Sequence, residues 1–238
     1  QIASNLANDL FDFLKGADRG GRLGPLRTAE AGLLTTRALG IAVAVCLGLA
    51  LLIGTYFVTI GGWSVVVLGV LAMLSAVAYT GGPFPLAYHG LGDLFAFAFF
   101  CPIAVMLTMH LMGAPLEAAA WLLGSAIGLL TTNILVVNNL RDVDQDRRAE
   151  KRTLVVRFGR NFGLLQYRGS LAGAYGLVVG GTVVGELPLA CLLALLALPF
   201  GLTLERKLTR SEGVAMNALL AATARHLLGF ALLLAVGL

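Results

Sequence analysis

The stretch of the chain from 38 to 92 contains no aspartate, glutamate, lysine or arginine. One membrane crossing needs about 20 apolar residues, so this stretch is too long for a single helix and predicts two crossings. Gly61 and Gly62 lie near its middle, and a Gly-Gly-Pro run at 81–83 ends its second apolar segment. Because these residues interrupt helices, we expect membrane spans at 38–60 and 63–80.

The remaining sequence repeats this pattern and predicts an all-α fold, a polytopic bundle of transmembrane helices. The chain is 58% hydrophobic and 13% charged, which is far too apolar for an ordinary soluble domain. We expect about seven spans in total, of which the other five lie at 94–116, 118–140, 169–185, 187–204 and 217–237.

The chain begins at Gln1 without a methionine and enters directly into a polar motif. We therefore expect residues 1–10 to be the end of another helix. Residues 1–238 should form a single transmembrane domain from which an N-terminal part is missing.

Sixteen of the 17 lysines and arginines lie in three connections that an alternating topology places on one side. The positive-inside rule makes this the cytoplasmic side. The net charge of +4 is thus explained by membrane topology, so it does not indicate a nucleic-acid-binding protein, and we exclude that class. The exception, Arg225, lies within the last span, where an ionisable group suggests a functional site, although snorkelling or a structural pair would also explain it. Cys46, Cys101 and Cys191 occur singly in apolar runs, which favours packing over disulfides or a thiolate metal site.

Eleven of the 13 acidic residues share the basic side, and most of them form two clusters that each begin with asparagine. The first cluster contains Asn8, Asp9, Asp12 and Asp18, and the second contains Asn138, Asn139, Asp142, Asp144 and Asp146. Residues four apart share a helix face, where like charges repel and need a neutralising partner. Solvated loop ends would explain one such cluster, but two of them, far apart in the chain and on the same side of the bundle, favour a binding site.

These clusters contain the oxygen ligands that Mg²⁺ prefers. Asn138, Asp142 and Asp146 would form one stripe on a helix, and Asn8 with Asp12 would form another across a cavity. Mg²⁺ takes its remaining ligands from water and phosphates, so the two stripes could bind one diphosphate through metal ions. Nearby basic residues could contact the same anion: Lys15, Arg22, Arg147, Lys151 and Arg152.

The chain resembles the UbiA-type intramembrane aromatic prenyltransferases over essentially its whole length. The segments that carry the resemblance are NLANDLFDFLKGAD (5–18), RLGPLR (22–27), YTGGPFPLAYHGLGD (79–93) and NNLRDVDQDRRAEKRTLVVRFGR (138–160). The third segment points to the branch of the family that acts on a naphthoate. Members of the family have nine spans, which implies that this chain lacks the first span and most of the second.

The resemblance implies transfer of a polyprenyl group from polyprenyl diphosphate to 1,4-dihydroxy-2-naphthoate, with loss of carbon dioxide and pyrophosphate, giving demethylmenaquinone. It also implies Mg²⁺ as cofactor and a place among the lipids of the bacterial plasma (inner) membrane, with the acidic motifs on the cytoplasmic face. By matching motif, the expected metal and diphosphate ligands are Asn8, Asp12, Asp142 and Asp146, while Asp9 and Asp18 match less well.

Three residues of the 79–93 segment are further candidates. Tyr79 could stabilise an allylic cation by its ring face or hydrogen-bond to substrate, although tyrosines also anchor membrane interfaces. His89 and Asp93 are four apart and could orient a hydroxyl or the carboxylate of the aromatic acceptor; a merely solvated loop histidine would explain His89 as well.

Two other functions remain open. A 4-hydroxybenzoate prenyltransferase is the alternative within the same family. A secondary transporter is the alternative from another class, but its acids should lie near the membrane midplane rather than at the ends of spans. A CDP-alcohol phosphotransferase would carry a D-G-x-x-A-R segment, which does not occur in the sequence.

Overall fold

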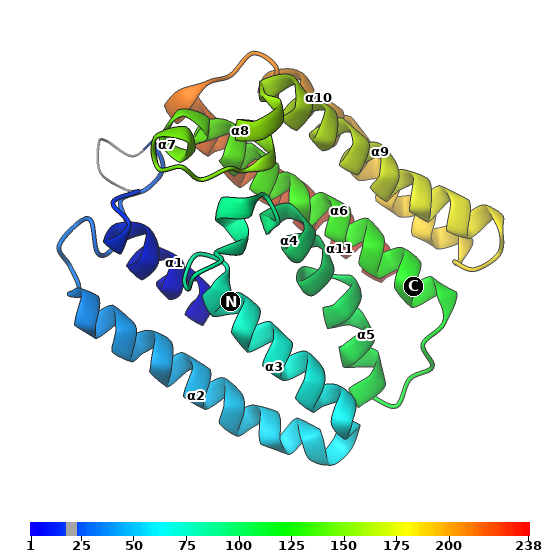
Figure 1. Ribbon diagram of the computed structural model, residues 1–238. Helices are drawn as coiled ribbons and strands as arrows, with labels where there is room; N and C mark the ends of the chain where they lie inside the picture. Colours follow the sequence, from blue (N-terminus) through cyan, green and yellow to red (C-terminus); the bar gives the residue numbers. More distant parts are fainter. Residues whose placement is uncertain (18–22) are drawn as a thin grey trace. The chain divides into compact units, whose positions relative to one another are not determined.

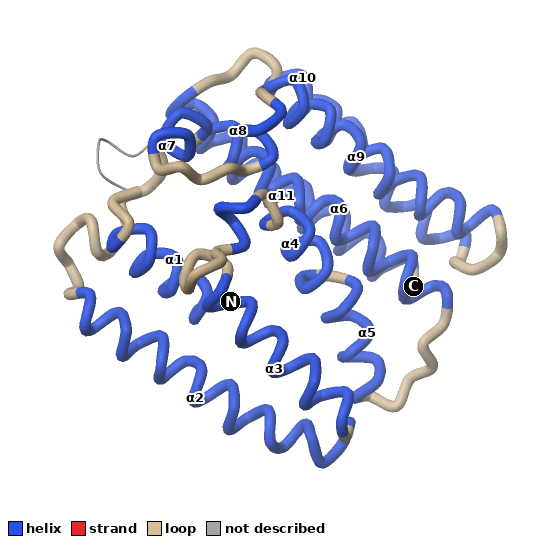
Figure 2. Tube along the Cα trace, viewed as in Figure 1, coloured by secondary structure: helices blue, strands red, loops and turns tan. Residues whose placement is uncertain are grey.

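The computed structural model describes residues 1–17 and 23–238, whose regular elements are all helices (Figure 1, Figure 2). The predicted all-α class is therefore confirmed. The described chain separates into two compact units, one comprising residues 1–92 and 144–153 and the other comprising residues 93–143 and 154–238. Two of the candidate site residues, Asp18 and Arg22, lie outside the described residues.

In the first unit, three helices pack side by side (Figure 1). They are α1 (Ile2–Leu14), α2 (Thr36–Gly61) and α3 (Trp63–Ala78). The 3₁₀ helix η1 (Leu86–His89) and most of the short helix α7 (Val143–Arg148) belong to the same unit. α1 carries the first acidic cluster, and α7 carries the end of the second.

Glycine separates α2 from α3, as the sequence predicts. Gly62 has a φ of +62°, a left-handed conformation that glycine adopts without steric cost. The chain reverses there, so that α2 and α3 form an antiparallel hairpin (Figure 1). At its other end α2 begins where the Thr35 side chain accepts a hydrogen bond from the Ala38 amide at 3.1 Å, which caps the helix.

The second unit contains the remaining helices. They are α4 (Gly92–Phe100), α5 (Pro102–Leu111), α6 (Ala118–Arg141), α8 (Leu154–Phe158), α9 (Arg160–Val183), η2 (Leu189–Ala197), α10 (Leu198–Leu208), η3 (Gly213–Ala215) and α11 (Met216–Gly237). The pairs α6–α9 and α11–η2 pack most extensively. Small residues permit the close approach: a Cβ at Gly237 would lie only 2.5 Å from the Ala190 carbonyl oxygen.

Polar side chains also join α9 to α11 inside this unit. The Tyr175 hydroxyl and the His226 Nε2 are 2.9 Å apart, and the Tyr167 and Thr223 hydroxyls are 3.4 Å apart. Phe230 packs edge-on against the Tyr175 ring. Polar groups in an apolar bundle need such partners, because no water is available to them there.

Two of the expected spans are irregular helices. The run predicted at 94–116 is split into α4 and α5 at Cys101, directly before Pro102, whose nitrogen cannot donate a helical hydrogen bond. The run predicted at 187–204 is a 3₁₀ helix that continues as α10, with Pro199 in the first turn of α10.

Five helical segments are long and apolar enough to cross a membrane, among the residues described: Thr36–Gly61, Gly92–Leu111, Ala118–Arg141, Leu189–Leu208 and Gly213–Gly237. In the first of these only 6% of the most apolar stretch is buried, so its leucines and isoleucines suit a lipid environment. α3 is also apolar but shorter than these five segments. α9 begins at Arg160, well before the predicted start of its span at 169. The number of spans remains a prediction.

Candidate functional site

The first acidic cluster places two buried carboxylates on α1. Asp9 is 6% exposed and Asp12 is 2% exposed. Asp9 accepts hydrogen bonds from the Thr28 amide at 3.0 Å, from the Thr28 hydroxyl, and from the Ala29 amide at 3.4 Å. Its two oxygens therefore hold the following segment against α1, and they leave Asp12 as the acid of α1 that faces charged neighbours.

Asp12 is surrounded by hydrogen-bond donors and positive charge. Arg27 Nη1 donates to its Oδ2 at 2.7 Å, and the Tyr88 hydroxyl donates to its Oδ1 at 2.9 Å. Lys151 Nζ lies 3.9 Å from Oδ2. Burial alone would raise the pKa of Asp12, but the charges of Lys151 and Arg27 and these hydrogen bonds outweigh it, so the pKa is lowered. Asp12 is therefore ionised at neutral pH, the form in which a carboxylate can bind a cation.

Asn8 and Lys15 lie one turn before Asp12 and at the end of the same helix. The Thr80 hydroxyl donates to Asn8 Oδ1 at 2.8 Å, and Lys15 Nζ donates to the Thr80 carbonyl at 2.5 Å. Lys15 Nζ also lies 4.2 Å from the centroid of the Tyr88 ring. Burial lowers the pKa of the Lys15 amine and the charge of Lys151 lowers it further, while Asp12 opposes both. The 79–93 segment thus lies against α1, as Tyr88 and Thr80 show.

Lys151 connects the two acidic motifs within the first unit. Its Nζ lies 3.9 Å from Asp12 Oδ2 and 3.8 Å from Asp146 Oδ1. Asp146 is 8% exposed and belongs to α7. Of the neighbouring residues, Arg152 donates its backbone amide to the Tyr88 carbonyl at 3.1 Å. Two aspartates from distant parts of the sequence therefore share one ammonium group.

Asp144 and Arg147 lie on the surface of α7. They form an exposed ion pair of 3.5 Å, in which the side chains are 77% and 62% exposed. Arg147 and Lys151 are therefore paired with different acids, since the described ion pair of Arg147 is with Asp144. That both bases bind one anion stays a prediction.

The predicted stripe of Asn138, Asp142 and Asp146 on one helix is wrong. α6 ends at Arg141, Asp142 has non-helical backbone angles (φ −96°, ψ 9°), and α7 starts at the next residue. At this break the Arg141 side chain hydrogen-bonds to Asn138 and to Asp142, and a stripe based on spacing alone does not take this cation into account.

Arg141 occupies the centre of the second motif. Its Nε and Nη2 donate to the two carboxylate oxygens of Asp142 at 2.7 and 2.6 Å. Nη2 also donates to Asn138 Oδ1 at 2.6 Å, and Nη1 donates to Asn217 Oδ1 at 2.8 Å. Arg141 is 3% exposed. Bidentate pairs of this kind have fixed geometry, so the oxygens of Asn138 and Asp142 converge on one point.

The 79–93 segment places its three candidates in different surroundings. Tyr79 follows α3 and lies against Gly92, where a Cβ would be 2.8 Å from the Tyr79 hydroxyl oxygen. His89 Nδ1 is 2.9 Å from the Pro85 carbonyl oxygen, and its ring stacks on Phe84 with centroids 3.7 Å apart.

The spacing of four between His89 and Asp93 does not put them on one helix face. Gly90 has a φ of +75° and ends η1 at His89, and α4 begins at Gly92. Asp93, in the second unit, accepts a hydrogen bond from Gln166 Nε2 at 2.9 Å and is 6% exposed. It is therefore held by α9 rather than by its sequence neighbours.

Several residues of these networks were absent from the sequence-based site. They are Arg27, Thr80, Tyr88, Arg141, Gln166 and Asn217. The first four lie inside the motif segments, so their position was a usable signal. Gln166 and Asn217 lie in apolar helices outside any motif, and only the packing of the helices brings them to their partners.

The donor chemistry suits Mg²⁺ that is shared with phosphate. The described residues contain no group of three or more acidic, histidine or cysteine side chains able to hold a metal by themselves. Mg²⁺ does not require such a cage, because it commonly uses one or two carboxylates and completes its shell with water and substrate phosphates. In the first unit Asp12 and Asp146 would supply such carboxylates, with the Asn8 amide oxygen as a further ligand. In the second unit Asp142 would supply one, with the Asn138 amide oxygen.

Comparison with known proteins identifies relatives. A sequence model described as the UbiA prenyltransferase family matches residues 1–229. The chain is 43% identical over 165 residues to the 1,4-dihydroxy-2-naphthoate octaprenyltransferase of Escherichia coli (strain K12). The aligned residues cover 67% of this chain and 54% of that protein. The chain thus spans about half the length of this relative.

Proteins with the same name from two other bacteria are also similar. The Mycobacterium tuberculosis protein (strain ATCC 25618 / H37Rv) is 35% identical over 204 residues, covering 84% of this chain and 68% of that protein. The Bacillus subtilis protein (strain 168) is 28% identical over 241 residues, covering all of this chain and 77% of that protein.

Proposed function

Because the chain belongs to the UbiA prenyltransferase family, a family of polytopic membrane proteins, we propose that it prenylates 1,4-dihydroxy-2-naphthoate. The donor is polyprenyl diphosphate, and the relatives named as octaprenyltransferases of this acceptor support the choice. The observation that carries the proposal is the shared surrounding of Asp12 and Asp146: two buried carboxylates and the Lys151 ammonium within 4 Å of both.

These groups suit a diphosphate. Lys15, Arg27 and Lys151 supply positive charge around Asp12. Arg27 and Lys151 now contact the Asp12 carboxylate and Lys15 contacts the Thr80 carbonyl, so phosphate oxygens can replace these acceptors. Asp12 and Asp146, with Asn8, would hold Mg²⁺ in the first unit, and Asp142, with Asn138, would hold it in the second. When bound, Mg²⁺ neutralises charge that develops on the departing diphosphate.

The reaction breaks the carbon–oxygen bond of the prenyl diphosphate and the carbon–carbon bond of the carboxyl group, and it forms one carbon–carbon bond. The bond between the prenyl C1 and the diphosphate oxygen breaks, and pyrophosphate leaves with the electron pair. The ring carbon that carries the carboxyl group attacks C1. The carboxyl group then leaves as carbon dioxide, its bond electrons restore the aromatic ring, and its proton ends on pyrophosphate.

The protein's own residues have distinct parts in this proposal. The basic side chains around Asp12 bind the leaving group and stabilise it as its charge grows. Tyr79 would face the allylic cation with its ring or hydrogen-bond to substrate, and Asp93 and His89 would orient the hydroxyls or the carboxylate of the acceptor. Apolar helices would accommodate the prenyl chain and exclude the water that would otherwise capture the cation.

The test uses membranes that contain the full-length protein. They are incubated with polyprenyl diphosphate, Mg²⁺ and either 1,4-dihydroxy-2-naphthoate or 4-hydroxybenzoate, and prenylated product and carbon dioxide are measured. We expect the naphthoate to be prenylated with release of carbon dioxide, and EDTA or Asp142→Asn to abolish the reaction. Asp144→Asn is the matched control, since Asp144 is an exposed acid of the same motif. The activity of this variant should stay near that of the wild type.

Each outcome decides between functions. Prenylation of 4-hydroxybenzoate alone would support prenyl transfer but identify 4-hydroxybenzoate, rather than the naphthoate, as the acceptor. Absence of transfer to either acceptor by a folded protein would reject the prenyltransferase proposal and favour transport.

We also propose that the acidic motifs face the cytoplasm of a bacterial plasma membrane, because the basic connections lie with them. Asp144→Cys, in a chain with Cys46, Cys101 and Cys191 replaced, should react with a membrane-impermeant maleimide in inverted vesicles but not in intact cells. Labelling in intact cells would reverse the topology.

A further inference from the structure

A groove of about 510 Å³ lies between α10 and α11 in the second unit. Phe200, Leu204 and Lys207 line it from α10, at spacings of three and four residues. Ala218, Ala222 and Arg225 line it from α11, again at spacings of three and four. Such spacing puts side chains on one face of a helix, so two facing stripes form the walls of the groove.

The groove combines an apolar wall with positive charge. Lys207, Arg210 and Arg225 border it, and no acidic residue lines it among those described. The acids closest in sequence are paired elsewhere: Glu205 with Arg168 and Glu212 with Arg160. The three bases therefore give the groove a charge that nothing in its lining compensates.

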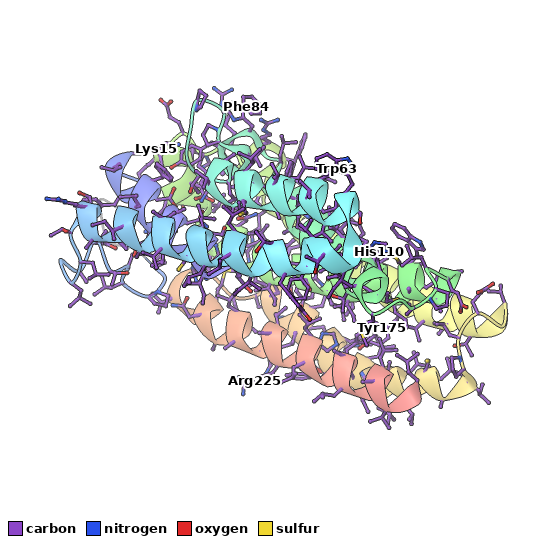
Figure 3. The ribbon with its side chains drawn as sticks, turned by 90° about the horizontal axis from the view of Figure 1, so that it is seen from below. Lys15, Trp63, Phe84, His110, Tyr175 and Arg225 are labelled. Carbon is purple, nitrogen blue, oxygen red and sulfur yellow. The ribbon has the colours of Figure 1, made fainter. Side chains whose placement is uncertain are left out.

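Arg225 shows this most clearly. It lies in the apolar helical segment Gly213–Gly237 and is exposed. Figure 3 shows its side chain projecting outward from α11. The described hydrogen bond of its guanidinium is a long one, 3.4 Å from Nε to the Ala221 carbonyl oxygen of its own helix. A guanidinium within a membrane span is costly unless an anion or water reaches it.

We infer that this groove binds an anionic membrane phospholipid. The phosphate would lie against Lys207, Arg210 and Arg225, and an acyl chain would lie along Phe200, Leu204 and Leu219. Basic pockets between transmembrane helices bind acidic headgroups in this way. The apolar wall favours a lipid over free phosphate, and the absence of a lining carboxylate among the described residues disfavours a diphosphate bound through Mg²⁺.

The inference does not depend on the proposed enzyme activity, because its test measures lipid retention. The protein, purified in mild detergent, is mixed with phosphatidylglycerol or with phosphatidylcholine of the same acyl chains, and bound lipid is counted by native mass spectrometry. We expect phosphatidylglycerol to be retained preferentially. Lys207→Gln, Arg210→Gln and Arg225→Gln should each weaken its retention about fivefold, since one basic residue near anionic lipid contributes about that factor.

Arg206→Gln is the matched control. Arg206 is an exposed base of the same helix but does not line the groove, so this variant should retain phosphatidylglycerol like the wild type. All four substitutions are at exposed side chains, and unchanged helix content and thermal unfolding would show that the fold is intact.

Several results would overturn the inference. Equal retention of phosphatidylcholine would remove the role of charge, and displacement of the lipid by inorganic phosphate at millimolar concentration would remove the role of the apolar wall. Unchanged retention in all three groove variants, or an equal loss in Arg206→Gln, would place the lipid elsewhere. Loss of polyprenyl diphosphate binding in the three groove variants, with phosphatidylglycerol retention unchanged, would assign the groove to the substrate instead.

Discussion

Arg141 donates hydrogen bonds to both carboxylate oxygens of Asp142, at 2.7 and 2.6 Å, although the two residues are adjacent in the chain. The same guanidinium reaches Asn138 one turn earlier and Asn217 on α11. A single buried cation thus joins the end of α6 to the start of the acidic motif and to α11.

Replacing Arg141 should destabilise the protein strongly. Arg141→Gln leaves the Asp142 carboxylate without its partner in a site that is 8% exposed, and breaking one side of a buried pair costs about 3–5 kcal/mol. Arg141→Lys should cost less, because it keeps the charge but not the bidentate geometry. Thermal unfolding in detergent measures both. Arg147→Gln, which removes an exposed pair, should change stability by less than about 1 kcal/mol, and an equal loss there would contradict this account.

Tyr88→Phe should remove one hydrogen bond to the Asp12 carboxylate while keeping the aromatic ring that contacts Lys15. The hydroxyl donates to Asp12 at 2.9 Å, so its removal should lower the free energy of unfolding by about 1 kcal/mol and also reduce prenyl transfer. Tyr88→Ala also removes the ring that lies 4.2 Å from Lys15 Nζ and should reduce prenyl transfer further. Activity and unfolding of both variants are compared with Tyr56→Phe, an exposed tyrosine of α2. If the Tyr56 and Tyr88 variants lost the same activity and stability, the Tyr88–Asp12 hydrogen bond would have no specific role.

Metal binding can be followed without measuring turnover. Mn²⁺ serves as a probe for Mg²⁺, and its electron paramagnetic resonance signal reports the free ion in the presence of a non-hydrolysable prenyl diphosphate analogue. Asp146→Asn should weaken Mn²⁺ binding roughly tenfold or more, the scale seen when groups around a metal are lost. Asp144→Asn should bind Mn²⁺ like the wild type. Undiminished binding in Asp146→Asn would exclude this aspartate from the metal site.

Gly81→Ala should destabilise the first unit. A Cβ at Gly81 would lie 2.5 Å from a ring carbon of Phe11 on α1, so either the Phe11 ring or the segment must shift. Overpacking of this kind costs about 1–3 kcal/mol. Gly69→Ala, in α3, is the control because a Cβ there meets no atom within 4 Å. It should be neutral or stabilising, since alanine favours helices. Combining Gly81→Ala with Phe11→Leu should recover part of the loss in unfolding temperature.

The helical class, the main apolar segments and the family could all be predicted from the order of residues. Uncharged runs of span length can hide their backbone polar groups only as helices, and the glycine pair at 61–62 can be interpreted as a break without knowing any tertiary contact. The segments with paired Asn and Asp were enough to indicate the family, to which the chain belongs.

The connections within the candidate site could not be predicted in this way, because they depend on helix packing. The spacing of Asn138, Asp142 and Asp146 predicts one helical stripe, yet α6 ends at Arg141, whose side chain is bonded to Asp142. Likewise Asp12 is neutralised by Arg27 and Lys151, which belong to other segments of the chain. Local spacing sets which side chains share a face of a helix. Which buried charges then meet depends on how helices pack, because a buried carboxylate is stable only beside the donors that packing brings to it.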